Sequence, residues 1–188
     1  MGWKIDYEKL FQYFKDKYQA SEIFYFGGIE IFGYKHDYLE TETVDLEKLK
    51  KYLSELSEKQ KVDSLRSTLI KGNYNKTRFY SKLNEFGYKL FIKPVKMYKN
   101  TNGNGFVKKA NCDVDMAFYL MKEKDNFDQT IILSGDGDFL PVLKYLKEIK
   151  KQIIVLARNE RAAREIKQFA GGNFRDFYRL EKYIKFER

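Results

Sequence analysis

Two continuous apolar runs, separated by a helical pattern, constrain the fold of this chain more than any other feature. The runs are "TIIL" (130–133) and "QIIVLA" (152–157), and the segment between them, "LPVLKYLKEIK" (140–150), repeats apolar residues at helical spacing. Strands that alternate with helices of about 10–15 residues predict a parallel sheet covered on both faces. An unbroken apolar run is typical of a strand with both faces buried. We therefore expect an α/β fold with 130–133 as a central strand.

The same periodicities predict the other elements. Helices are expected at 6–18, 44–60, 75–87, 113–123 and 160–170, and strands at 22–28 and 88–98. Asp6 is expected to cap the first helix, and Gly87 stands in the usual C-terminal capping position. Pro94 predicts an edge strand or a strand end, and "NTNGNG" (100–105) predicts a loop.

Length and composition exclude several classes of protein. The 188 residues suit one domain, and no linker divides them. No apolar stretch approaches the ~20 residues of a membrane span, and no signal peptide is recognisable at the N-terminus. Cys112 is the only cysteine and His36 the only histidine, which excludes a disulfide framework, a cysteine-based zinc site and histidine-pair chemistry. A reducing cytoplasm is the expected compartment.

The net charge of +9 favours a polyanionic partner such as RNA or DNA. A chain rich in Lys, Tyr, Asn and Phe is equally expected from an A/T-rich genome, so the charge alone decides nothing.

The segment "SGDGDF" (134–139) carries the chemistry, because it follows the strand 130–133 directly and ligands of parallel sheets lie outside the carboxyl ends of the strands. Asp136 and Asp138 on one tight turn repel each other unless a cation neutralises them, and Mg²⁺ and Mn²⁺ prefer carboxylate ligands. The glycines allow a sharp turn and a close approach to a phosphate, and Ser134 could orient a water or a phosphate oxygen. The structural alternative is that Asp138 caps the next helix, and both roles are compatible.

Other motif assignments fail on spacing. An EF-hand would need a glutamate where Lys147 stands, and a dinucleotide fingerprint would need a third glycine where Leu140 stands. A phosphatase with Asp136 as nucleophile is less easily dismissed, although the threonine that usually follows such a motif is replaced by Leu140.

Asp113 is the candidate ligand outside the turn. On a helix of 100° per residue it shares a face with Ala117 and Leu120, which should pack inward, whereas Asp115 lies about 200° away and should face water. A capping role and a ligand role both suit Asp113.

A lysine-rich segment precedes Asp113. Its cations are interleaved with aromatic residues, an arrangement that suits a nucleic-acid strand through phosphate contacts and base stacking, although a solvated loop would look the same. The cations are Lys93, Lys96, Lys99, Lys108 and Lys109, around Tyr98 and Phe106.

The sequence resembles the NYN domains of the PIN-like nuclease superfamily. The matching segments are "KKANCDVDMAFYLM", "TIILSGDGDFLPVLKYLKEIKKQIIVLA" and "GGNFRDFYRLEKYI", and the resemblance covers most of the chain from residue 5. It implies a three-layer, Rossmann-like α/β domain over 1–188, with a mainly parallel central sheet and a helical insertion at roughly 34–70. It also implies a Mg²⁺- or Mn²⁺-dependent ribonuclease with Asp113, Asp136 and Asp138 as metal ligands and Ser134 beside them.

One family feature is missing. Members open with a first strand that ends in Asp-Gly-x-Asn, and its aspartate completes the acidic cluster. This chain begins "MGWKIDYEKL", and Asp6 is expected to cap a helix instead. The resemblance therefore predicts that the first strand is absent here, through truncation, through natural loss or through replacement by a partner chain, and that catalysis is impaired. An open gap in the sheet would also encourage homo-oligomers.

Two hypotheses follow for function. The first is a metal-dependent ribonuclease; the alternative is a non-catalytic RNA-binding or regulatory scaffold that keeps the acidic turn without its chemistry.

Overall fold

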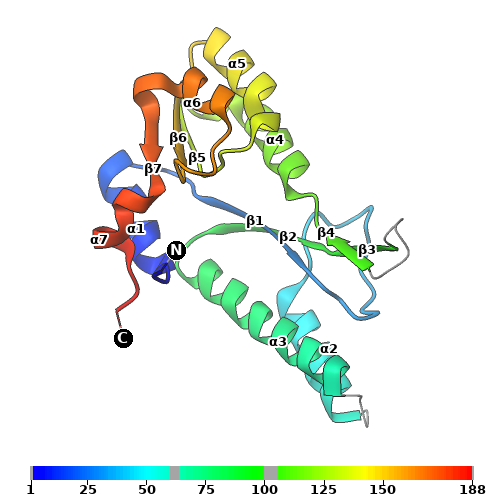
Figure 1. The fold of residues 1–188 in the computed structure, drawn as a ribbon. Helices are drawn as coiled ribbons and strands as arrows, with labels where there is room; N and C mark the ends of the chain where they lie inside the picture. Colours follow the sequence, from blue (N-terminus) through cyan, green and yellow to red (C-terminus); the bar gives the residue numbers. More distant parts are fainter. Residues whose placement is uncertain (1, 60–63, 100–105, 188) are drawn as a thin grey trace. The chain divides into compact units, whose positions relative to one another are not determined.

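The computed structural model describes residues 2–59, 64–99 and 106–187 (Figure 1). The fold is α/β with parallel strands, as the sequence predicts. The elements in chain order are α1 (Tyr7–Tyr18), β1 (Phe24–Ile29), α2 (Leu46–Lys59), α3 (Ser64–Glu85), β2 (Lys89–Pro94), β3 (Lys96–Lys99), β4 (Phe106–Lys109), α4 (Cys112–Lys122), β5 (Gln129–Ile132), α5 (Leu140–Glu148), β6 (Gln152–Ala157), α6 (Arg164–Ala170), β7 (Phe174–Asp176) and α7 (Glu181–Ile184). Within the described ranges, no helix is long and apolar enough to cross a membrane.

The chain forms two compact units. Unit 1 comprises Met1–Tyr13 and Asp113–Arg188, and unit 2 comprises Phe14–Cys112.

Unit 1 is built on a three-stranded parallel sheet with the strand order β5-β6-β7. Alternate residues of β6, among them Ile153, Val155 and Ala157, enter a core with apolar residues of α5 and α6. Figure 1 shows both helices beside β6, with which they are in contact. Leu156 is buried on the other face of β6. The strand β6 is thus buried on both faces, as its apolar run predicts.

The strand β5 differs from the prediction of a central strand. Among the described residues it pairs only with β6, so it forms one edge of the sheet of unit 1. Leu133, directly after β5, is therefore 47% exposed although it continues the apolar run. An apolar run indicates that a strand is buried, but it does not show how many strands are paired with it.

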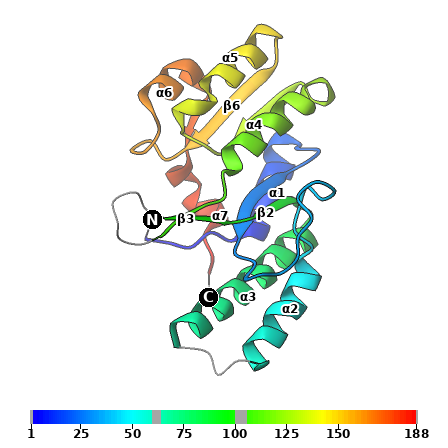
Figure 2. The same cartoon turned by 90° about the vertical axis from the view of Figure 1, so that its right-hand side faces the viewer.

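Unit 2 holds the parallel pair β1-β2, the antiparallel pair β3-β4 and the helices α2 and α3. Figure 2 shows α2 and α3 side by side, and their contact buries Leu49, Leu53 and Ile70. The buried Tyr80 of α3 donates its hydroxyl hydrogen bond to the Gly28 carbonyl of β1 at 3.0 Å. This bond joins the helical layer of unit 2 to its sheet.

Several local predictions are confirmed. Asp6 caps α1, because its Oδ1 accepts hydrogen bonds from the N–H groups of Glu8 and Lys9, both at 3.0 Å. Gly87 follows α3 with a φ of 101°, a conformation that glycine adopts without strain. Pro94 is the last residue of β2. The predicted loop at 100–105 lies outside the described residues.

Candidate functional site

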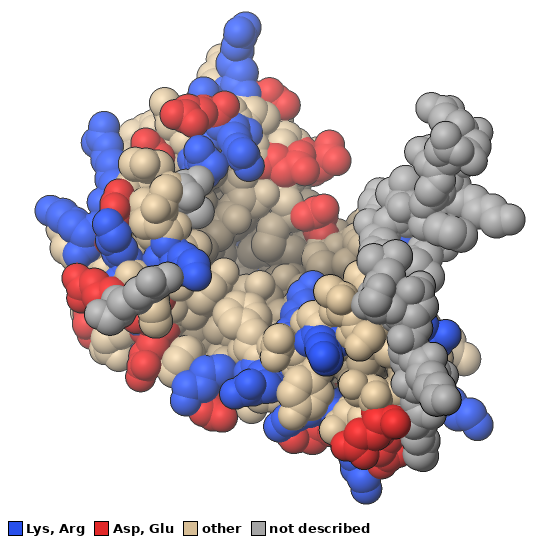
Figure 3. Space-filling model, turned by 60° about the horizontal axis from the view of Figure 1, so that its bottom comes forward, with Lys and Arg blue, Asp and Glu red and all other residues tan. Residues whose placement is uncertain are grey.

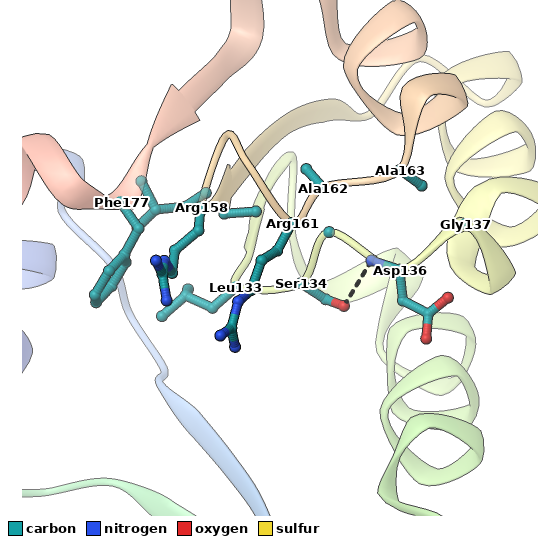
Figure 4. A pocket seen from close by; sticks show the side chains of 12 residues that line it. Leu133, Ser134, Asp136, Gly137, Arg158, Arg161, Ala162, Ala163 and Phe177 are labelled. Carbon is teal, nitrogen blue, oxygen red and sulfur yellow. Dashed lines mark hydrogen bonds between the residues drawn. The ribbon is translucent and has the colours of Figure 1, made fainter. Parts of the chain in front are cut away.

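The acidic turn, residues 134–138, follows β5 and enters a 3-10 turn, η2 (Gly137–Phe139), before α5 begins. The Asp136 carboxylate caps η2, because its Oδ1 accepts a hydrogen bond from the Asp138 N–H at 3.0 Å. The Ser134 Oγ accepts a hydrogen bond from the Asp136 N–H at 3.2 Å (Figure 4). These two bonds define the backbone path of the acidic turn.

The sequence-based assignment of the cap to Asp138 is therefore wrong. The helix α5 starts at Leu140, and its N-cap residue, Phe139, makes no side-chain capping bond. Because a 3-10 turn precedes the helix, the capping position moves two residues upstream, to Asp136. Pro141 stands in the first turn of α5, where its missing N–H is tolerated.

The acidic turn combines an anchored backbone with accessible carboxylates. Phe139, directly after the turn, is 2% exposed and belongs to the core of unit 1. Asp136 and Asp138 are exposed, and Ser134 is half-buried. The turn can therefore present two carboxylates to a ligand while Phe139 holds it against the core.

Asp113 and Asp115 have exposures opposite to those predicted. Asp113 is exposed and Asp115 is half-buried, in the first turn of α4. Ala117 and Leu120 pack against the core of unit 1, as predicted. No residue of α4 is fully buried, and its first turn leaves Asp113 exposed.

The three predicted metal ligands lie in unit 1, with Asp113 on α4 and the other two, Asp136 and Asp138, on the acidic turn. Within residues 2–59, 64–99 and 106–187, no three His, Cys, Asp or Glu side chains are close enough to hold one ion together. The assignment of all three as ligands to the same metal stays a prediction.

A pocket of about 560 Å³ opens beside the acidic turn, within unit 1. Its walls come from the acidic turn, from the carboxyl end of β6 and from the loop that follows β6 (Figure 4). The lining residues are Leu133, Ser134, Gly135, Asp136, Gly137, Leu156, Ala157, Arg158, Arg161, Ala162, Ala163 and Phe177. The pocket therefore lies outside the carboxyl ends of two adjacent parallel strands, where ligands of α/β proteins bind.

The loop 158–163 is fastened to the acidic turn. The Ala163 N–H donates a hydrogen bond to the Gly135 carbonyl at 2.8 Å. A Cβ atom added at Gly135 would lie 2.7 Å from the Cα of Ala162 and 3.2 Å from the Cβ of Ala157. Only glycine leaves room for this approach, so the second residue of "SGDGDF" is a packing requirement of the pocket.

Two arginines of the pocket, Arg158 and Arg161, were missed by the sequence reasoning. Both come from the loop 158–163, and Figure 4 shows their side chains extending toward the same side of the pocket. The sequence could have indicated Arg158, because this residue directly follows the apolar run of β6. That position places it at the carboxyl end of a strand, where ligands bind.

The predicted RNA-binding lysines lie in unit 2, on β2, β3 and β4. Lys93 is half-buried and Lys96 is exposed. The antiparallel register pairs Lys96 with Lys109, while the side chains of Lys99, Lys108 and Lys109 lie outside the described part of the structure. Their role in RNA binding stays a prediction.

Comparisons with known proteins agree with the fold and with the sequence motifs. The sequence model of the NYN domain matches residues 32–177. The low amplitude and bright protein LabA of Synechococcus elongatus is 24% identical over 135 residues, which are 71% of this chain and 72% of LabA. The crystal structure of a Vibrio parahaemolyticus protein of unknown function superposes with a TM-score of 0.53 at 13% identity, over 98% of this chain and 83% of the other. At this identity, the structural match supports the fold alone.

Proposed function

Because the chain belongs to the NYN domain family, we propose that it is a metal-dependent ribonuclease that hydrolyses phosphodiester bonds of RNA. One observation carries the proposal: an anchored turn presents the exposed carboxylates of Asp136 and Asp138 at a carboxyl strand end, beside a pocket lined by arginines. Carboxylates and cationic groups side by side are what a metal-assisted attack on a phosphate requires.

The proposed cofactor is Mg²⁺ or Mn²⁺. The donors of the acidic turn fit such an ion, because Mg²⁺ is commonly held by one or two carboxylates and keeps several waters. Asp136 and Asp138 would hold it, with Asp113 as the proposed third ligand. When bound, the metal supplies an activated water and neutralises negative charge on the phosphate.

The residues of the turn prepare this chemistry. The Asp138 N–H bonds the Asp136 Oδ1 and so fixes the direction of that carboxylate, while its second oxygen makes no hydrogen bond to the described residues. The Ser134 Oγ accepts a hydrogen bond from the Asp136 N–H. The hydroxyl proton of Ser134 is still available for a hydrogen bond to a water or to a phosphate oxygen. Ser134 therefore acts as an orienting group in the proposal.

RNA is the proposed substrate because the chain carries a net charge of +9. On the face that Figure 3 shows, basic side chains are interspersed with acidic ones. The single cysteine, Cys112, agrees with the proposed location in a reducing cytoplasm.

A cleavage assay tests the proposal. Mixed single-stranded and structured RNA is incubated with Mn²⁺ or with EDTA and the wild-type, Asp136→Asn or Asp128→Asn protein. Asp128 is a matched control, because its fully exposed carboxylate makes only a 3.8 Å ion pair with Lys151.

We expect the wild type and Asp128→Asn to cleave RNA only when Mn²⁺ is present, at a rate limited by the missing first-strand carboxylate. Asp136→Asn should be slower than the wild type by at least about 100-fold. RNA binding by Asp136→Asn should be unchanged or stronger, because one negative charge near the phosphates is removed. Cleavage that persists in EDTA, or in Asp136→Asn, would contradict the proposal.

The second candidate is a non-catalytic RNA-binding or regulatory scaffold. The observation that favours it is that no three potential metal ligands converge within the described residues. This function predicts metal-independent RNA binding by all three proteins and no cleavage by any of them.

A further inference from the structure

The pocket beside the acidic turn is cationic on one wall. Arg158 and Arg161 are three residues apart on the same loop, and both line the pocket together with Ser134. Leu156 and Phe177 contribute apolar wall, which weakens local screening of charge by water. The two positively charged guanidinium groups line the same pocket and repel each other. An anion bound between them would relieve this repulsion, so the arrangement favours anion binding.

The loop that carries the arginines is fixed in place before any ligand binds. The N–H groups of Arg161 and Ala162 donate to the Arg158 carbonyl at 3.0 and 2.9 Å. The Lys167 ammonium donates to the Asn159 carbonyl at 3.2 Å. Together with the bond between Ala163 and Gly135, these contacts order the backbone of the loop, so little backbone entropy is lost on binding.

The charges of the two arginines are only partly compensated. Arg158 forms an ion pair with Glu160 at 3.3 Å, a carboxylate that is 81% exposed and therefore a weak partner. Arg161 makes no ion pair with any of the described residues. Asp136, the acidic residue of the lining, caps η2 through Oδ1, and Figure 4 shows its carboxylate on the far side of Ser134 from the arginines. The pocket thus retains net positive charge.

We propose that Arg158 and Arg161 bind a phosphate group of the RNA strand and so position it against the acidic turn. The planar guanidinium fork matches the oxygens of a phosphate, and a volume of about 560 Å³ is sufficient for a nucleotide unit. The identity of the ligand as RNA rests on the proposed function, whereas the phosphate chemistry follows from the arginines. The bound group is either a phosphodiester within the strand or a terminal 5′-phosphate.

The test measures binding in EDTA, so that it does not depend on catalysis. A fluorescent single-stranded 12-nucleotide RNA, made with a 5′-hydroxyl or a 5′-phosphate, is titrated with wild type, Arg158→Gln, Arg161→Gln, Arg161→Lys and Arg164→Gln. Arg164 is the matched control, because it is an exposed arginine on the following helix that loses the same charge but does not line the pocket. Circular dichroism melting curves verify that each variant is folded.

We expect Arg161→Gln and Arg158→Gln to weaken RNA binding about tenfold or more, and Arg164→Gln by less than about twofold. Arg161→Lys should recover only part of the loss, because lysine keeps the charge but lacks the fork. The slope of log K against log salt should fall by about 0.7 for each phosphate contact removed. A penalty equal in both RNAs identifies an internal phosphodiester, and a penalty confined to the phosphorylated RNA identifies a terminal phosphate.

Equal losses in all the glutamine variants would overturn the inference, because they would reflect net charge and not a site. Undiminished binding in Arg161→Gln, or no RNA binding by the wild type, would overturn it as well. The proposed nuclease activity fails separately, when the wild type binds RNA in EDTA but does not cleave it with Mn²⁺.

Discussion

Replacing Gly135 by alanine tests whether the acidic turn and the arginine loop are packed as one structure. The added Cβ would lie 2.7 Å from the Ala162 Cα and 2.9 Å from the Ala162 Cβ. Carbon atoms in ordinary contact are about 3.5–4.0 Å apart, so one of the two segments must move by close to 1 Å. The obstacle is backbone, not the end of a flexible side chain, and a change of rotamer cannot relieve it.

The expected loss of stability is about 1–3 kcal/mol, the usual range for an overpacked site. Ala162 is 9% exposed and its neighbour Ala163 is hydrogen-bonded to the Gly135 carbonyl, so a shift of the loop also strains that bond. For a chain of this length, such a loss lowers the melting temperature by about 2–12 °C. Because the loop carries Arg158 and Arg161, RNA affinity should fall in the same variant.

Thermal melting followed by circular dichroism measures the effect, with Gly172→Ala as the control. A Cβ added at Gly172 would meet nothing within 4 Å, so this variant should remain within about 0.5 kcal/mol of the wild type. If Gly135→Ala has the same melting temperature as Gly172→Ala, the close packing of the acidic turn on the loop is refuted.

Further substitutions at three positions probe single interactions. Asp136→Ala should cost about 1 kcal/mol in urea unfolding through loss of the cap, whereas Asp136→Asn, which keeps an acceptor oxygen, should change stability by less than about 0.5 kcal/mol. The backbone N–H and then the ammonium of Lys48 lower the pKa of Asp45, so this carboxylate stabilises the fold at neutral pH and the contribution is lost on acidification through that lowered pKa. Asp45→Asn should therefore make the fall of the melting temperature below about pH 4 shallower, and an unchanged acid profile would contradict this. Tyr80→Phe should destabilise the fold by about 1 kcal/mol in urea unfolding, because the Gly28 carbonyl loses a buried donor, and a variant as stable as the wild type would show that this bond is dispensable.

Elements that depend on local periodicity were predicted correctly from the sequence. Elements whose bounds depend on tertiary packing were not. The strand β6 was predicted over its observed bounds, and the caps at Asp6 and Gly87 follow from the chemistry of those residues alone. The helix α3, by contrast, begins at Ser64, well before the predicted start at 75. Its first half reads poorly as a helix because of Gly72, yet it is stabilised because Ile70 packs into the core of unit 2.

The sequence predicted where the acidic turn lies in the fold, but it did not predict which other residues line the pocket beside it. The carboxyl end of a parallel strand located the acidic turn, since that inference needs only the order of the elements. The cap was misassigned to Asp138 because a 3-10 turn ahead of a helix has no distinct sequence signal. Arg158 and Arg161 were overlooked because they become neighbours of Ser134 only through the pairing of β5 with β6.

The role of Asp136 as a cap and its proposed role as a metal ligand support each other. A carboxylate has two oxygens with about four lone-pair sites, and the Asp138 N–H uses only one of them, at Oδ1. The bond restricts rotation of the side chain, so the ordering of a ligand group is largely completed on folding and is not required again on metal binding. A turn selected only for helix capping would function equally well with serine or asparagine at this position. The proposed metal site differs from a cap in this respect, because it requires carboxylates at both Asp136 and Asp138.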